Sequence, residues 1–337
     1  MFEDGLAELH THLGGSVASD IMWSLAHEQG INLPTRDYWE FDRLVTVSGP
    51  RGVPNLDALD RIYHLTELIQ SSPFAVERSV HAAIGGAYRS QGITTLELRF
   101  NPMKRNRGGE RDLDHIILAA TRGLDIASLE YPQVRAGLIL MMDRTFSADQ
   151  NMVIVEKALR YRSRGIVGVD IAGPRPGGAR YDYTQIREHV ELARDGGLGI
   201  TIHVGEEGGE FGLAEIAEVV DALRPDRLGH GILAARDSSL MASIRDADIT
   251  LEVCPTSNLL TKALAGQDAL RETLRAFVDN GVPFTIATDG PEMMRTHLRD
   301  ELELLLRIGA LSDDELAAAN ARGHDASFVG GRTRAHA

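Results

Sequence analysis

The sequence predicts an α/β protein whose strands close into a (β/α)8 TIM barrel. Short apolar runs alternate with longer amphipathic stretches along the chain, which is typical of a parallel sheet covered by helices. Eight such runs occur in 337 residues, and eight strand–helix units in one domain favour a closed barrel over an open doubly wound sheet. No internal repeat or low-complexity linker divides the chain. We therefore expect one domain over residues 1–329 and a flexible tail over 330–337.

The predicted strands are the apolar runs, taken in chain order. They cover residues 6–9, 94–100, 136–142, 166–171, 199–204, 227–229, 249–253 and 284–288. Helix-like stretches between them include 152–162, 184–194 and 215–223.

The first crossover is longer than the others and contains two amphipathic stretches, 17–29 and 56–70. We expect a helical insert over about 14–93 near the barrel mouth, where active-site lids commonly lie.

Composition narrows the class of protein and of partner. The net charge of −14 disfavours nucleic acid and anionic membranes as partners. The single cysteine, Cys254, excludes an internal disulfide and a cysteine-based zinc site. No apolar run approaches the roughly 20 residues that span a bilayer, and the acidic start lacks the positive region of a signal peptide. A cytoplasmic protein is expected, while the oligomeric state is not predicted.

Potential metal ligands lie at the carboxyl ends of four predicted strands. His10 and His12 end the first strand, and residues two apart in a strand point to the same face. His203, His230 and Asp289 lie at the ends of the fifth, sixth and eighth strands. The carboxyl ends of barrel strands form the catalytic face. Each motif alone is more often structural, but their coincidence at one barrel mouth favours a metal site.

This set of side chains predicts hydrolytic chemistry. Three neutral imidazoles and a carboxylate suit Zn²⁺ with a position left for water, although Fe²⁺, Co²⁺ or Mn²⁺ could use the same ligands. Such a metal lowers the pKa of its water to near neutral. Glu206, three residues after His203, can then act as general acid or base. His230 could bind the metal or handle a proton, and Asp289 could bind both metal and water.

Seven motifs in order resemble those of the adenosine deaminase family of metal-dependent amidohydrolases. They are ELHTHL at 8–13, LELRF at 96–100, GVDIAG at 168–173, HVGE at 203–206, RLGHG at 227–231, EVCPTSN at 252–258 and ATD at 287–289.

The resemblance implies a role for each motif residue. It implies that His10, His12, His203 and Asp289 hold zinc. It further implies that Glu206 protonates N1 of a 6-aminopurine as hydroxide attacks C6, and that His230 positions and deprotonates the water. The Gly173 backbone N–H would bind N3, and an inosine-type product and ammonia would result.

Two positions depart from the family pattern and bear on the substrate. Gly14 stands where family members commonly carry an Asp that contacts the ribose 5′-hydroxyl. Gly290 stands where a second Asp usually contacts N7, and Glu292 is either a substitute or an ordinary helix N-terminal acid. These departures favour a 5′-modified adenosine, such as 6-amino-6-deoxyfutalosine of an alternative menaquinone route, over adenosine.

Three alternatives remain open. They are an adenosine deaminase of purine salvage, an amidohydrolase that deaminates another heterocycle, and a catalytically dead nucleoside-binding relative.

The remaining polar candidates are expected to be structural. We expect Cys254 to be buried, Glu97 and Arg99 to point into the barrel or its rim, Asp170 to support the Gly173 turn, and Glu207 to face solvent. The other eight histidines are expected on helix surfaces or in the core: His27, His64, His81, His115, His189, His297, His324 and His336.

Overall fold

A computed structural model describes residues 4–47, 53, 56–107, 111–207 and 211–329. The predicted tail, 330–337, lies outside these residues. The eight strands are β1 (Leu6–His12), β2 (Ile93–Phe100), β3 (Arg135–Asp143), β4 (Ile166–Ala172), β5 (Gly199–Val204), β6 (Arg227–His230), β7 (Thr250–Val253) and β8 (Phe284–Ile286).

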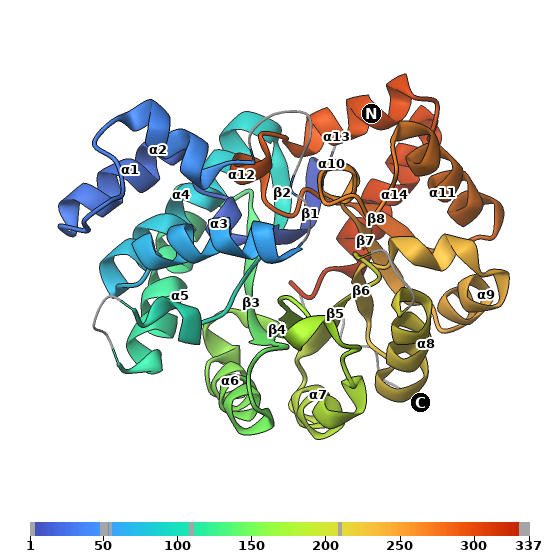
Figure 1. Ribbon diagram of the computed structural model, residues 1–337, viewed down its shortest axis with the longest axis horizontal. Coiled ribbons are helices and arrows are strands. Elements are labelled where there is room, and N and C mark those ends of the chain that lie inside the picture. Colours follow the sequence, from blue (N-terminus) through green and yellow to red (C-terminus); the bar gives the residue numbers. More distant parts are fainter. Residues whose placement is uncertain (1–3, 48–52, 54–55, 108–110, 208–210, 330–337) are drawn as a thin grey trace.

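The strands form the predicted (β/α)8 barrel. Each strand pairs in parallel with the next, in the order β1 to β8, and the helices surround them (Figure 1). The ring closes just beyond β8, where Asp289 forms a parallel bridge with Thr11 of β1. The main chain of Asp289 donates to the His10 carbonyl at 2.9 Å and accepts from the His12 amide at 2.8 Å. Closure therefore places Asp289 beside both histidines of β1.

Helices occupy every crossover. They are α1 (Ser19–Glu28), α2 (Tyr38–Val45), α3 (Leu56–Ile69), α4 (Pro73–Gln91), α5 (Leu113–Glu130), α6 (Ala148–Arg160), α7 (Arg187–Asp195), α8 (Gly212–Leu223), α9 (Ser238–Asp246), α10 (Pro255–Leu260), α11 (Gln267–Asp279), α12 (Pro291–Met294), α13 (Leu298–Arg307) and α14 (Asp313–Ala326). Four of them, α1 to α4, lie between β1 and β2. Among the described residues, no helix is both long and apolar enough to cross a bilayer.

Local sequence explains where several helices begin and end. Ser72 caps α4 by accepting from the Ala75 amide, Pro73 opens the helix, and Gly92 ends it in the left-handed conformation. In α6, Ser147 and Gln150 form a reciprocal capping box.

Beneath the strand ends, the barrel interior holds a buried ionic network. Arg227 contacts Glu97 and Glu252, and Arg99 contacts Glu252 and Asp170 at 2.8 Å each. All five side chains are fully buried. The prediction that Glu97 and Arg99 are structural residues inside the barrel is confirmed. This network fixes two carboxylates, Glu252 and Asp170, directly under the histidines of the site.

Candidate active site

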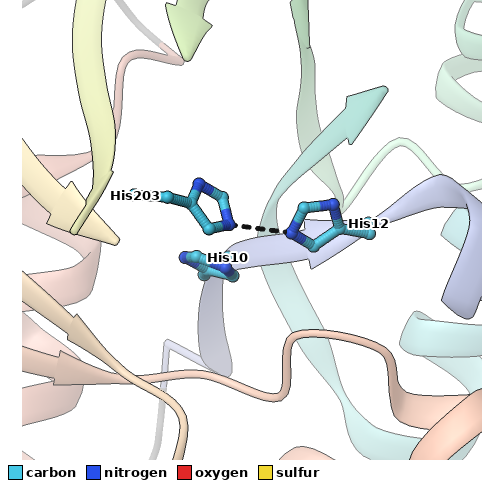
Figure 2. Close-up of side chains that lie close together, drawn as sticks. All are labelled: His10, His12 and His203. Carbon is cyan, nitrogen blue, oxygen red and sulfur yellow. Dashed lines mark hydrogen bonds between the residues drawn. The ribbon is translucent and has the colours of Figure 1, made fainter. Parts of the chain in front are cut away.

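Three histidines converge at the carboxyl ends of β1 and β5. His10 and His12 share one face of β1, although the pairing of β1 with β2 shifts register between Glu8 and Thr11, the kind of bulge that re-aims side chains near active sites. His203 reaches them from β5 (Figure 2). One ring nitrogen from each histidine lies within 4.8 Å of the others, and the Nε2 atoms of His12 and His203 are 3.0 Å apart.

A carboxylate holds the far side of two of these rings. His10 Nδ1 lies 2.6 Å from Glu252, and His203 Nδ1 lies 2.9 Å from Asp170. Each Nδ1–H can donate to its carboxylate, which leaves the Nε2 lone pair facing the shared centre. Asp170 therefore orients His203, and the expectation that it supports the Gly173 turn is wrong. Asp170 lies three residues before Gly173 in the sequence, but its side chain contacts His203 of another strand, and local sequence does not reveal that contact.

The environment keeps the imidazoles of His10 and His12 neutral. Burial, followed by the charge of Arg99 for His10 and of His203 for His12, holds both pKa values well below the ordinary value. His10 Nε2 is buried and has no hydrogen-bond partner among the described residues. A neutral imidazole with an unused lone pair, oriented by a carboxylate, is what a divalent metal requires of a ligand. The residues present therefore fit a metal ion.

Asp289 joins this group through His12. Its Oδ1 lies 3.4 Å from His12 Nε2, and its Oδ2 accepts a hydrogen bond from Ser257 at 2.7 Å. Asp289 has a φ of 68° and His230 a φ of 62°, which L-residues seldom adopt. Such backbone strain concentrates at functional sites.

Glu206 and His230 form a second pair beside the histidines. Their closest atoms, Oε2 and Nε2, are 3.2 Å apart. Burial alone would raise the pKa of Glu206, but the hydrogen bond and charge of His230, with the charges of His203 and Arg144, hold it well below the ordinary value. Burial would lower the pKa of His230, but Glu206 raises it. Asn258 contacts the other nitrogen of His230 at 3.1 Å and fixes its ring.

Arg144, which directly follows β3, was not foreseen from the sequence. It donates to Glu206 Oε1 at 3.2 Å and also to the carbonyls of Gly173 and His203. It thus ties three candidate site residues together. The sequence did contain a signal, because the charged pair Asp143-Arg144 comes at the end of an apolar strand. His203 was found from the same kind of position.

One pocket contains most of the predicted site residues. Its empty space, including solvent at the open mouth, is about 550 Å³. Its lining includes His12, His203, Glu206, Asp289 and Gly173. Gly173 has a φ of +95°, and a Cβ there would lie 2.9 Å from Asp143 Oδ2, so both conformation and space require glycine.

Helix α3 closes the pocket from above β1 with Leu56, Leu59 and Tyr63. The Tyr63 ring lies 5.6 Å from the His12 ring, centroid to centroid. Burial and the charge of Asp289 raise the pKa of the phenol well above its ordinary value. Tyr63 was also missed, because the sequence does not indicate where an inserted helix docks.

Gly14 and Gly290 lie under Tyr63. At Gly14 a Cβ would be 2.9 Å from the Tyr63 ring, and at Gly290 a Cβ would be 2.9 Å from its hydroxyl. Glu292, considered as a substitute for a carboxylate at 290, instead lines a second cavity together with Asp20 and His297.

The remaining predictions have mixed outcomes. Cys254 is buried, as expected. Glu207 does not simply face solvent, because Arg175 donates to its carboxylate at 2.6 Å. Among the described residues, none of the groups of potential metal ligands contains another histidine, and His336 lies outside those residues.

Comparison with known proteins agrees with this geometry. The family model described as adenosine deaminase matches residues 5–336. An adenosine deaminase of Vibrio vulnificus is 29% identical over 309 residues, covering 91% of this chain and 89% of the relative. One from Shewanella denitrificans is 29% identical over 327 residues, covering 96% and 94%.

Solved structures share the fold. The adenine deaminase of Arthrobacter aurescens superposes with a TM-score of 0.83 at 22% identity, covering 96% of this chain and 94% of its own. An amidohydrolase of Burkholderia ambifaria with bound Zn gives 0.83 at 22% identity, covering 96% and 86%. The Arabidopsis ADAL protein complexed with IMP gives 0.80 at 23% identity, covering 97% and 94%.

The family model spans nearly the whole chain, and the histidines and Glu206 of the motifs that suggested the resemblance lie together at the carboxyl ends of the strands. The chain therefore belongs to the adenosine deaminase family and is a deaminase, a hydrolase that acts on a carbon–nitrogen bond.

Proposed function

We propose that the chain hydrolyses the 6-amino group of a purine nucleoside, giving a 6-oxopurine and ammonia, and that zinc is its metal. The observation that carries this proposal is one cluster of side chains: the three imidazoles and Asp289 lie beside the Glu206–His230 pair. Ligands for a metal and a proton-transfer pair are the two parts that hydrolytic deamination needs.

His10, His12, His203 and Asp289 would hold the metal. Bound there, it would act as a Lewis acid and lower the pKa of water to near neutral. The choice of zinc rests on the ligand types and on the bound Zn of the Burkholderia relative.

The Glu206–His230 pair would move the proton. At 3.2 Å the two groups titrate together, so one proton is shared by the pair. His230 would hold the attacking water and take its proton, and Glu206 would give a proton to purine N1. Protonation of N1 would make C6 more electrophilic and so favour addition of the hydroxide there. The proton of the new C6 hydroxyl would then pass through the pair to the amino nitrogen, the C6–N bond would break, and ammonia would leave as the 6-oxo group forms.

Arg144 would keep Glu206 in place during this transfer. Its guanidinium is nearly fully buried and bonded to Glu206 and to two carbonyls of the pocket wall. On the same wall, the Gly173 backbone N–H would bind purine N3 and fix the plane of the ring.

A 5′-modified adenosine, such as 6-amino-6-deoxyfutalosine, is our proposed substrate in preference to adenosine. Gly14 supplies no side chain to recognise a 5′-hydroxyl. A site built to bind a hydroxyl discriminates strongly against analogues that lack it, while a site without such a group does not.

The test is ammonia release from a panel of substrates, with metal content determined on the same sample. The panel contains adenosine, 5′-deoxyadenosine, 5′-methylthioadenosine, 6-amino-6-deoxyfutalosine and adenine. We expect the highest kcat/KM for a 5′-modified nucleoside. Equal kcat/KM for adenosine and the 5′-modified members would contradict the proposed preference, and inactivity of metal-loaded protein toward all five would contradict purine deamination.

A further inference from the structure

We propose that Tyr63 of α3 is a substrate-positioning residue, whose hydroxyl donates a hydrogen bond to purine N7 and whose ring fills space that Gly14, Gly15 and Gly290 leave open. This inference rests on the proposed function and specifies how the same pocket recognises the heterocycle.

Three glycines from two distant segments face the same side chain. A Cβ at Gly14 would lie 2.9 Å from Tyr63 Cδ1, one at Gly15 would lie 3.1 Å from the hydroxyl, and one at Gly290 would lie 2.9 Å from the hydroxyl. A side chain at Gly14 or Gly290 would therefore displace Tyr63, and one at Gly15 would press closely on it.

Backbone conformation does not require glycine at these positions. The φ of Gly290 is −140°, which any residue adopts, and the φ values of Gly14 and Gly15 also fall outside the left-handed region. Gly173 in the same pocket differs, because its φ is +95°. Space for the Tyr63 side chain is thus the structural reason for glycine at 14 and 290. Gly15 has a further reason, because a Cβ there would lie 2.7 Å from the Cα of Gly290.

The Tyr63 hydroxyl is a donor with a weak partner. It reaches Asp289 Oδ1 at 3.5 Å, well beyond the usual 2.5–3.0 Å of an O–H···O bond. Tyr63 lines the pocket together with Glu206 and Gly173. An acceptor atom of a bound ligand can therefore accept a hydrogen bond from this hydroxyl, and the protein would lose only the weak contact with Asp289.

Purine chemistry identifies the acceptor. The proposed function assigns N1 to Glu206 and N3 to Gly173, and N9 carries the sugar. N7 is the ring nitrogen left with a free lone pair. It lies on the same edge of the ring as the 6-amino group, and that edge must face the histidines. The Tyr63 ring lies tilted against the His12 ring and its hydroxyl contacts Asp289, so the hydroxyl lies at that edge.

The first experiment compares kcat/KM of wild type, Tyr63→Phe and Tyr88→Phe on the preferred nucleoside and on its 7-deaza analogue. Tyr88, on α4, is a matched control outside the pocket. We expect Tyr63→Phe to lower kcat/KM on the parent nucleoside about tenfold, and to cause no further loss on the 7-deaza analogue. An equal loss on both substrates, or no loss on either, would overturn the assignment.

A second experiment tests the space argument without activity. Gly290→Ala should lower the melting temperature in wild type but less so in a Tyr63→Phe background, because the clashing oxygen is then absent. Gly86→Ala, where nothing lies within 4 Å of the added methyl, is the control. Equal loss in both backgrounds would contradict the inference. If wild type deaminates no purine, the proposed function fails; if it does and Tyr63→Phe is silent, only this inference fails.

Discussion

At the scale of single residues, the site depends on two carboxylates that lie behind the histidine rings, on the side away from the proposed metal position. Glu252 and Asp170 hold the rear nitrogens of His10 and His203, and both carboxylates are anchored by Arg99. Groups in this position fix the ring orientation and typically change metal affinity 10- to 100-fold when lost.

Asp170→Asn should therefore weaken metal binding about 10- to 100-fold, because an amide oxygen is a poorer acceptor for His203 Nδ1–H than a carboxylate. A competition titration against a chelator measures the effect, with the melting temperature recorded to confirm folding. Asp182→Asn, at the exposed start of a 3₁₀ turn (Tyr183–Ile186), is the control. Unchanged affinity in folded Asp170→Asn would show that Asp170 does not orient the ligand.

Glu206→Gln should retain the metal and lose about 10²- to 10⁴-fold in kcat, because glutamine cannot transfer a proton to N1. Ammonia release and metal content on one sample separate the two effects. Glu207→Gln serves as the neighbouring control, since Glu207 bonds to Arg175. Near-normal turnover by Glu206→Gln would remove Glu206 from the mechanism.

At the scale of elements, the sequence predicts those that local pattern determines. The β5 prediction, 199–204, matches the observed strand, because an apolar run there is flanked by glycines. The eighth strand ends at Ile286 rather than 288, because the chain turns toward β1 to place Asp289. The stretch 184–194 divides into a 3₁₀ turn and α7 (Arg187–Asp195), which period alone does not distinguish.

The candidate site was predictable where its residues sit at strand ends, and not where long-range docking decides. His10, His12 and His203 follow from barrel geometry, since parallel strands end at one face. Tyr63 and Gly290 are far apart in the chain, and their contact depends on how α3 docks. Asp170 illustrates the same limit, because its partners come from β2 and β5.

Element packing also predicts a pH dependence of stability. Glu301 of α13 is fully buried and accepts from the Thr256 amide and the Thr296 hydroxyl. Burial raises its pKa to about 7 from 4.5. The folded state binds this proton more tightly than the unfolded state. The protonated Glu301 therefore contributes to stability at low pH, and this contribution is lost as the pH rises from about 4.5 through 7.

Glu301→Gln should remove this dependence. The melting temperature of the variant minus that of wild type should be more positive at pH 8 than at pH 5. The corresponding change in stability is about a few kcal/mol at most. Glu303→Gln, on the exposed face of α13, is the control. The same offset at both pH values would show that Glu301 does not titrate in this range.

At the scale of the whole molecule, metal binding and folding should be coupled. The proposed ligands come from β1, β5 and the segment after β8, so the metal would join the first, middle and last strands of the barrel. A ligand that binds only the folded state stabilises it by about 4 kcal/mol at a thousandfold excess over its Kd.

Removal of the metal should therefore lower the melting temperature, and addition of Zn²⁺ should restore it. Differential scanning calorimetry of the purified protein, chelated and reloaded, measures this. His27→Ala, a surface histidine of α1, should behave as wild type, whereas His203→Ala should lose the response. A metal response that survives in His203→Ala would place the ion elsewhere.

The most direct test of the central claim measures ammonia release, 6-oxopurine formation and metal content on one sample, before chelation, after it and after reloading. We predict one ammonia for each 6-aminopurine nucleoside consumed, at a rate that follows metal occupancy. Metal-loaded protein that releases no ammonia from any 6-aminopurine nucleoside, or metal-free protein that keeps full activity, would contradict a metal-dependent deaminase.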